Sequence, residues 1–228
     1  MTAKLHFPAM TGLSRTTQAS VTDYLRKAIL SGELPAGTRL VQAEIAEALN
    51  VSVTPIREAL RELSTQGLVN LDAFRGAVVH TPTLAELEEI FEIRAVLLPL
   101  SIQKGVYGIT AQEIEQAELL LVQMEAECDR PRWVELNRQF HSLLYQADRS
   151  SHLKNLLQRL SDIASIYINL SFVEKPLQKE LSEKEHRELL EAYRCKDVAR
   201  ATQVTLNHIN STLEAARKVL QKTYETIS

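Results

Sequence analysis

The chain has 228 residues, a formal net charge of −3, and a composition that is 45% hydrophobic and 24% charged. This length allows two domains, each with a core of its own. Charge is spread almost evenly: residues 1–80 carry 8 Lys and Arg against 7 Asp and Glu, and the rest of the chain carries 18 against 22. Nucleic-acid binding by the whole surface is therefore excluded, and any DNA contact must depend on where a few arginines lie.

Two cysteines, Cys128 and Cys195, match no zinc-knuckle or redox spacing, so we expect both to be small buried hydrophobic residues. Such cysteine usage suits a reducing cytoplasm. The N-terminus has no charged segment followed by an apolar one, and no run approaches the roughly 18 apolar residues of a membrane span. We therefore predict a soluble cytoplasmic protein with no membrane partner.

The first 80 residues predict short helices joined by tight turns. Five of the seven glycines fall in this part of the chain, and glycine permits the backbone conformations that tight turns require. Asn50 can adopt the left-handed conformation that ends a helix, and Pro55 suits the first turn of the next one. The predicted helices cover residues 18–31, residues 42–49 and a third segment that begins at Ser52 or Val53.

A hairpin is predicted after the third helix. Two β-prone stretches, 68–71 and 77–80, flank the turn-forming residues 72–76. Helix, helix, turn, helix and hairpin is the order of a winged helix-turn-helix with a small β wing. We assign this domain to residues 1–80 and expect residues 1–15 to be flexible.

The remainder, residues 81–228, is poor in glycine and predicts helices and no strand. Thr83 with Glu86, and Thr110 with Glu113, form the Thr-x-x-Glu capping box that begins a helix. Further segments repeat apolar residues at helical spacing, so we expect an all-α bundle of about six helices in a mainly α protein. These further segments cover residues 131–147, 151–172, 182–195 and 198–221.

The third predicted helix separates an apolar stripe from a polar one. Ile56 and Leu60 can pack against the domain, whereas Arg57 and Arg61 face away from it. In a helix-turn-helix, this helix enters the major groove with its N-terminal residues at base edges. Arg57 could donate to guanine O6 and N7, or to a phosphate. Alternatively, both arginines pair with glutamates such as Glu58 on a solvated helix.

Other residues of this domain are also candidates for contact with DNA. Ser52 and Thr54, at the start of the third helix, can donate to phosphates beside the backbone N–H groups there. Arg75, at the hairpin tip beside flexible Gly76, could reach the DNA backbone or the adjacent minor groove.

The runs LPAGTRL, AEIAEALNVSVTPIREALREL, QGLV and RGAVV resemble the DNA-binding domain of the GntR family of bacterial transcriptional regulators, over residues 20–80. The resemblance implies that Ser52, Thr54, Arg57 and Gly76 contact operator DNA. The family usually carries an arginine between the serine and the threonine, where this chain has Val53. This departure implies that the operator differs from the common family sequence or is bound more weakly.

Three histidines lie in predicted helices of the C-terminal domain beside apolar neighbours: His141, His186 and His208. A single histidine on an apolar face is more often a hydrogen-bonded core residue than a ligand. Three in one bundle, with Asn137 one helical turn before the first, favour a shared site instead. Three imidazoles and an oxygen ligand suit zinc, nickel, manganese or iron, with positions left for water or a small carboxylate.

From about residue 84 to residue 220 the chain resembles FCD, the all-helical ligand-binding domain of the FadR branch of the same family. Its metal-binding members carry an acidic or amide residue four positions before a histidine, and two more histidines separated by about 22 residues. The same interval separates His186 from His208. The resemblance thus implies that Asn137, His141, His186 and His208 hold a divalent metal.

Two positions depart from that pattern. Asn137 replaces a frequent aspartate, which removes a negative charge and implies a weaker site that favours an anionic effector as an additional ligand. Arg94 matches the family's arginine on the first helix of the domain, but the glutamate common four residues later is Leu98 here. Arg94 could hold an effector carboxylate through paired charge-assisted hydrogen bonds, or brace its helix against a neighbouring glutamate.

We therefore predict a homodimeric, sequence-specific transcriptional regulator that a small organic acid controls, and the resemblance implies repression. A three-histidine metalloenzyme is disfavoured, because Glu185 and Glu188 flank His186 but point to other faces of the helix, away from a metal-bound water. The remaining alternative is a metal-free regulator whose histidines and Asn137 bind an organic ligand directly.

Overall fold

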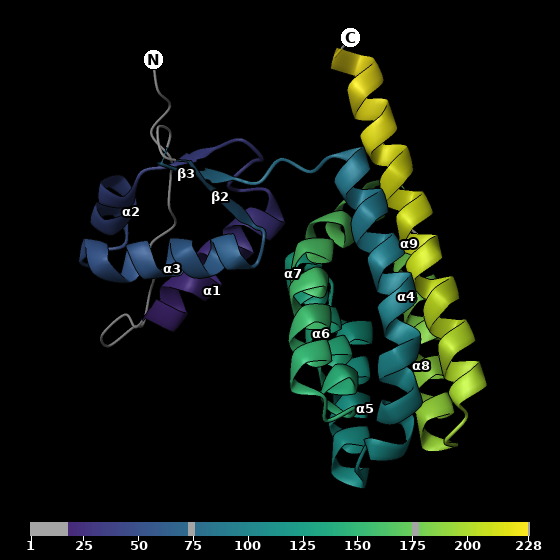
Figure 1. Ribbon diagram of the computed structural model, residues 1–228. Helices are drawn as coiled ribbons and strands as arrows, with labels where there is room; N and C mark the ends of the chain where they lie inside the picture. The colour runs from purple at the N-terminus through teal and green to yellow at the C-terminus, as the bar shows by residue number, and fades with distance from the viewer. Residues whose placement is uncertain (1–17, 73–75, 175–177, 228) are drawn as a thin grey trace. The chain divides into compact units, whose positions relative to one another are not determined.

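A computed structural model of the chain describes residues 18–72, 76–174 and 178–227. These residues form two compact units that divide between Thr81 and Pro82, and Figure 1 labels the elements of both. Two expectations, the flexibility of residues 1–15 and the wing contact of Arg75, concern residues outside the described part of the chain.

The first unit is a winged helix-turn-helix, as predicted. Strand β3 lies between β1 and β2 and pairs antiparallel with both. The predicted hairpin is thus confirmed, but β1 was not predicted, because two residues are too few to show an alternating pattern. The elements are α1 (Gln18–Ser31), β1 (Arg39–Leu40), α2 (Gln42–Ala48), α3 (Val53–Thr65), β2 (Val69–Asp72) and β3 (Gly76–Val79).

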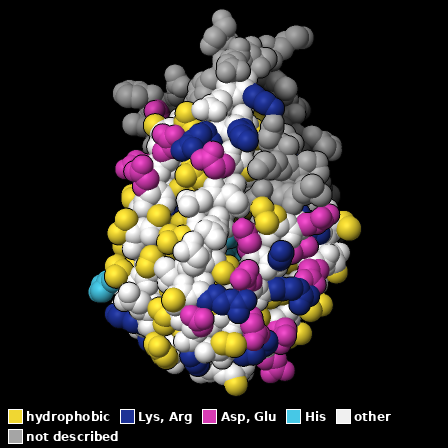
Figure 2. Space-filling model, turned by 90° about the vertical axis from the view of Figure 1, so that its right-hand side faces the viewer, with side chains coloured by type: hydrophobic (Ala, Val, Ile, Leu, Met, Phe, Trp, Pro, Cys, Tyr) yellow, Lys and Arg dark blue, Asp and Glu magenta, His cyan; other side chains and the backbone are white. Residues whose placement is uncertain are grey.

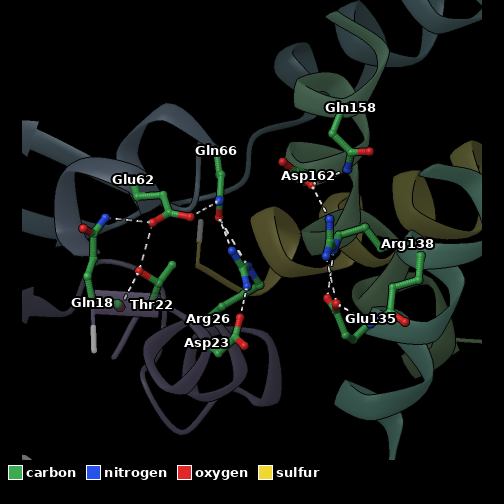
Figure 3. A network of polar contacts seen from close by, with 11 residues as sticks. Gln18, Thr22, Asp23, Arg26, Glu62, Gln66, Glu135, Arg138, Gln158 and Asp162 are labelled. Carbon is green, nitrogen blue, oxygen red and sulfur yellow. Dashed lines mark hydrogen bonds and ion pairs between the residues drawn. The ribbon is translucent and has the colours of Figure 1, made fainter. Parts of the chain in front are cut away.

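Helix α3 is held against α1 by both apolar and polar contacts. Its apolar stripe is buried, with Ile56, Ala59 and Leu63 fully inaccessible. At the other edge of the contact, the Glu62 carboxylate accepts a hydrogen bond of 3.1 Å from the buried Thr22 hydroxyl (Figure 3). These contacts fix the orientation of α3, so its opposite face is presented to solvent.

The second unit is an all-helical bundle, which confirms the prediction of six helices for the described residues. The long last helix packs along α4, α7 and α8, and Figure 1 shows α4 and α9 side by side. The helices are α4 (Leu84–Gly108), α5 (Ala111–Ala126), α6 (Arg130–Gln146), α7 (Ser151–Glu174), α8 (Gln178–Arg194) and α9 (Val198–Ile227).

Of the two predicted capping boxes, the one at the start of α5 is complete and the one at the start of α4 is half formed. At α5 the box is reciprocal: the Thr110 hydroxyl accepts from the Glu113 N–H, and the Glu113 carboxylate accepts from the Thr110 N–H. At α4 the Thr83 hydroxyl likewise accepts from the Glu86 N–H, while the Glu86 carboxylate accepts a 2.6 Å hydrogen bond from Tyr167 of α7. The second contact links the start of α4 to a distant helix.

The C-terminal end of α4 lies unusually close to the end of α6. A Cβ atom at Gly108 would overlap the carbonyl oxygen of Ala147, whereas one at Gly105 would lie 3.4 Å from the carbonyl oxygen of Leu144 and from the Tyr193 hydroxyl. Glycine at residue 108 therefore permits the close approach of these two backbones.

The surface of the helical unit carries mixed charge. On the face shown in Figure 2, acidic and basic side chains are interspersed. Ion pairs such as Arg194 with Glu118 and Arg200 with Glu188 join neighbouring side chains of opposite sign. Among the described residues, no helix combines the length and hydrophobicity that a bilayer span requires.

Both cysteines are exposed and free, so the expectation that they are buried was wrong. Cys128 lies in the connection between α5 and α6, and Cys195 directly follows α8. Chain segments at the ends of helices run over the surface, which overrides the general tendency of cysteine to be buried.

Candidate functional site

Four helices of the second unit bring together the polar residues that the sequence singled out. Helix α6 carries Asn137 and His141 on its buried face, while α8 and α9 supply His186 and His208. Helix α4 supplies Arg94, which is only 3% exposed. All five residues are buried, so each must satisfy its polar atoms inside the bundle or bind something there.

The three imidazoles form one compact cluster. Their ring centroids lie 5.0 Å apart for His141 and His186, 5.4 Å for His141 and His208, and 4.6 Å for His186 and His208. One nitrogen from each ring can be chosen so that all three lie within 4.8 Å of one another. The sequence could not show that the rings converge, and the structure brings them together.

Two of these nitrogens already have the spacing that ligands of one ion adopt. The Nε2 atoms of His141 and His186 are 3.2 Å apart. Two imidazole nitrogens at about 2.0–2.1 Å from an ion are separated by roughly 2.9 Å in octahedral and 3.4 Å in tetrahedral geometry. The observed distance lies between these values, so little movement would be needed to bind an ion.

The third histidine is oriented by a carboxylate. Nδ1 of His208 donates a 2.7 Å hydrogen bond to Glu185 Oε2, and both side chains are largely buried. That bond places the proton on Nδ1 and leaves Nε2 with a free lone pair, as in the carboxylate–histidine pairs that surround many metals. The sequence did not identify this contact, because Glu185 was considered there only as a base for a metal-bound water.

Burial keeps two of the histidines neutral. The pKa of His141 is lowered well below its usual value by desolvation, and further by the neighbouring His208 and Arg94. The pKa of His186 is lowered well below its usual value by desolvation, and further by the neighbouring His208 and His141. A neutral imidazole is the form that binds a metal, so the site is suited to a cation without a prior proton release from these two rings.

Three buried polar atoms near this cluster have no hydrogen-bond partner among the described residues. They are Oδ1 of Asn137, Nδ1 of His186 and Nε of Arg94. Leaving such atoms unsatisfied costs roughly 1–3 kcal/mol each. The guanidinium of Arg94 lies 5.0 Å from the centre of the Phe91 ring, and no ion pair with a described carboxylate offsets its charge. The residues present therefore fit a bound cation with an oxygen ligand, together with an anion.

The candidate DNA-contacting residues lie on the exposed face of α3. The side chains of Arg57 and Arg61 are 49% and 62% exposed, and both pair with Glu58, at 3.4 Å and 3.1 Å. Exposed pairs of this kind contribute only about 0–1 kcal/mol, so either arginine can exchange Glu58 for a phosphate or a base at little cost. The solvated ion pairs considered from the sequence thus exist, and they are compatible with DNA binding.

The start of α3 is also open to solvent. Ser52 and Thr54 are exposed, and Ser52 makes no capping hydrogen bond to the helix. Their hydroxyls lie beside backbone N–H groups of the first turn, which have no intrahelical partner. At the wing, Gly76 has a positive φ of 76° and open space around it. The candidate residues of the recognition helix therefore share one end and one face, where a polyanion could bind.

A helix-turn-helix with a β wing and an exposed arginine face, followed by a helical bundle with a buried polar cluster, is the arrangement of a transcriptional regulator. Residues 17–79 match the model of the bacterial regulatory proteins of the gntR family, and residues 89–211 match that of the FCD domain. The chain belongs to the GntR family of transcriptional regulators with a C-terminal FCD domain. Such regulators bind operator DNA, and the chain is not an enzyme.

Relatives match over nearly the whole chain. An uncharacterized regulator of Bacillus subtilis, YdhC, is 29% identical over 207 residues, which are 87% of this chain and 90% of the relative. The repressor RspR of Escherichia coli is 25% identical and covers 90% of both chains. The solved structure of E. coli McbR/YncC superimposes with a TM-score of 0.75 at 22% identity, over 92% of this chain and all of that one. The last comparison supports the fold alone.

Proposed function

We propose that this regulator is a repressor with a metal-containing effector site: a divalent transition ion inside the FCD domain helps to hold a small organic acid, and binding of the acid changes the affinity of the winged domain for its operator. The proposal rests on the convergence of three buried imidazoles beside two polar atoms that have no hydrogen-bond partner among the described residues, the Asn137 amide oxygen and Nε of Arg94. Repression is supported by relatives that are described as repressors, RspR among them.

The metal ligands would be His141, His186 and His208, with the amide oxygen of Asn137 as a fourth. Zinc, nickel, manganese and iron all accept imidazole ligands, and the bound ion would supply a positive charge that an effector carboxylate can join. Elemental analysis of protein purified without an affinity tag tests this assignment. We expect one transition ion per chain, and tighter binding in Asn137→Asp, because a carboxylate is a stronger ligand for a cation than an amide. Unchanged affinity in that variant would remove Asn137 from the ligand set.

Arg94 would hold the effector. Its guanidinium is buried near His141, whose pKa it lowers, so its charge acts at the cluster. A buried cation without a carboxylate partner is strongly stabilised by an anion that binds it with two hydrogen bonds. Thermal-shift measurements with a panel of organic acids should show stabilisation of the wild type, and loss of it in Arg94→Gln. Stabilisation that is equal in the two proteins would contradict this role.

A metal-free regulator is the second candidate, because the Nε2 atoms of His141 and His186 are also within hydrogen-bond distance of each other. Two neutral imidazoles can share one proton across 3.2 Å, and the organic ligand would then contact them directly. The same elemental analysis separates the two candidates. Wild-type protein that contains no stoichiometric transition ion would favour the direct ligand site.

We further propose that Ser52, Thr54, Arg57, Arg61 and the wing residues Arg75 and Gly76 bind operator DNA. Footprinting on DNA beside the gene tests this: Arg57→Ala should weaken binding by about 1–3 kcal/mol if the arginine contacts a base. Arg130→Ala is the matched control, because Arg130 is an exposed arginine of the helical unit. Wild-type protein that protects no sequence would overturn the DNA-binding assignment.

A homodimer would present two recognition helices to the two halves of a pseudo-palindromic operator. Exposed apolar side chains on one face of α4 support such pairing, because a stripe of this kind is a typical interface surface. Sedimentation analysis should give the mass of two chains, and Val96→Glu in this stripe should reduce it toward one. The stripe consists of Ile93, Val96, Leu100 and Tyr107.

A further inference from the structure

Val53 is an exposed apolar residue among polar and charged ones. It is the first residue of α3, and 44% of its surface is exposed. Ser52 and Thr54 on either side are exposed as well. Arg57 and Arg61 follow at intervals of four residues, so the three side chains share one face of the helix.

Packing and helix stability do not explain this valine. The contact between α3 and the rest of the unit is made by other residues of the helix, which are buried: Ile56, Ala59, Leu60 and Leu63. Valine also restricts its own rotamers in a helix, and an exposed first-turn position is better filled by a polar or acidic residue. The apolar side chain is therefore available for a contact outside the protein.

We propose that Val53 contacts the 5-methyl group of a thymine in each operator half-site. The inference rests on the proposed function, because it requires that α3 enters the major groove. In that groove thymine presents its 5-methyl group, an apolar feature that distinguishes it from the other bases. Apolar side chains recognise this group by contact. The side chain of Val53 has no donor for guanine or for a phosphate. It therefore selects thymine by van der Waals contact, next to the bases or phosphates that Arg57 reaches.

This reading predicts the base that the operator carries at one position. A side chain with donors at residue 53 would favour guanine O6 and N7, whereas valine leaves those acceptors unsatisfied and dehydrated. The same argument predicts what Val53→Arg does: it should change the preferred base at that position from thymine to guanine.

The experiment uses the full-length protein and an operator selected by it from a random DNA pool. Each thymine of the half-site is replaced in turn by deoxyuridine, which lacks only the methyl group. At one position per half-site we expect Kd to rise about fourfold, the effect of one methyl group that loses its contact. The same replacement should raise Kd less for Val53→Ala, whose single methyl group makes a smaller contact with the thymine methyl.

Several outcomes would overturn the inference. One is a half-site in which no thymine is sensitive to uracil replacement, and another is sensitivity that persists fully in Val53→Ala. A third is selection by Val53→Arg of the same base as the wild type. Failure of the proposed function looks different, because the wild-type protein would then enrich no sequence from the pool. Since Val53 is exposed, its variants should keep the far-ultraviolet circular dichroism of the wild type, and this confirms that they are folded.

Discussion

The two functional regions place polar groups in opposite environments. On α3, Arg57 and Arg61 are exposed and exchange their hydrogen bonds with water and with Glu58. In the helical unit, Arg94 and the three histidines are buried, and several of their polar atoms lack a partner among the described residues. The arginines of α3 thus have hydrogen-bond partners without DNA, whereas the buried cluster holds polar atoms that no described residue satisfies.

This difference determines how ligand binding in each region affects the stability of the protein. Exposed ion pairs contribute little, so α3 can bind different phosphates and bases without loss of stability. Buried unsatisfied groups destabilise the unliganded state, and a ligand that satisfies them binds the folded bundle selectively and stabilises it. Variants that affect one region and spare the other test this division.

The largest expected effect is that of His186→Ala on metal binding at the proposed site. His186 is 1% exposed and lies within reach of both other imidazoles. Mutation of residues that only hydrogen-bond to a metal ligand costs about 10–100-fold in metal affinity, so loss of a ligand itself should cost more than about 100-fold. Isothermal titration or elemental analysis measures the loss, and DNA binding in the absence of effector should persist.

His152→Ala is the control for this variant, since His152 is exposed at the start of α7. It should bind metal as the wild type does. Equal metal content in His186→Ala and His152→Ala would mean that the cluster is not the metal site, and a loss of sequence-specific DNA binding in His186→Ala alone would mean that the two regions are not separable.

A pH dependence confined to the helical unit comes next. In metal-free protein, burial and the neighbouring Arg94 and His208 hold the pKa of His141 well below 6.5, and burial does the same for His186. Below about pH 6.5 the unfolded chain then binds up to two more protons than the folded one. The free energy of unfolding therefore has its full value above that pH and decreases as the pH is lowered further. The slope should reach roughly 2.7 kcal/mol per pH unit, about 1.4 for each histidine.

Thermal unfolding of chelator-treated protein between pH 7.5 and 5.5 measures this slope. The double variant His141→Gln/His186→Gln provides the comparison, because glutamine does not titrate in this range while Glu185 and His208 are retained. It should lose most of the decline in the melting temperature. A decline of the same size in the double variant would place the titrating groups elsewhere in the protein.

The sequence was sufficient where a pattern is local. The stripe of Arg57 and Arg61, the helix end at Asn50 and the capping box at Thr110 are each contained in a short segment, and each occurs as predicted. Such features depend on the spacing of neighbouring residues, which the sequence gives directly.

Features that depend on packing between distant segments could not be predicted. A shared site of His141, His186 and His208 was predicted from their number and from the resemblance, but their distances depend on how α6, α8 and α9 pack together. The bond from His208 to Glu185 depends on the same packing. The close approach of α4 to α6 at Gly108 likewise has no local signal, because a glycine near a helix end is equally compatible with an ordinary cap.

Gly108→Ala should destabilise the helical unit and spare the winged one. The added Cβ would overlap the Ala147 carbonyl oxygen, which belongs to the backbone and cannot rotate away. We expect a loss of about 1–3 kcal/mol, the usual effect of an overpacked site. Gly105→Ala is the milder control, since its Cβ would lie at 3.4 Å from its nearest neighbours. Hydrogen exchange should increase in α4 and α6 and stay unchanged in α1 and α3; an equal effect of the two variants would contradict the close approach.

The smallest expected effect lies in the winged unit. In Thr22→Val a methyl group replaces the buried hydroxyl that donates to Glu62 at 3.1 Å, while Glu62 keeps its 3.2 Å hydrogen bond from Gln18 (Figure 3). The loss should be about 1 kcal/mol, the net contribution of one such hydrogen bond. Thr65→Val is the control, because the exposed Thr65 hydroxyl bonds only within its own helix among the described residues. Hydrogen exchange should increase in α1 and α3 for Thr22→Val and not for Thr65→Val. The helices from α4 onward should keep their protection in both variants, because the polar contacts that orient the recognition helix lie within the winged unit.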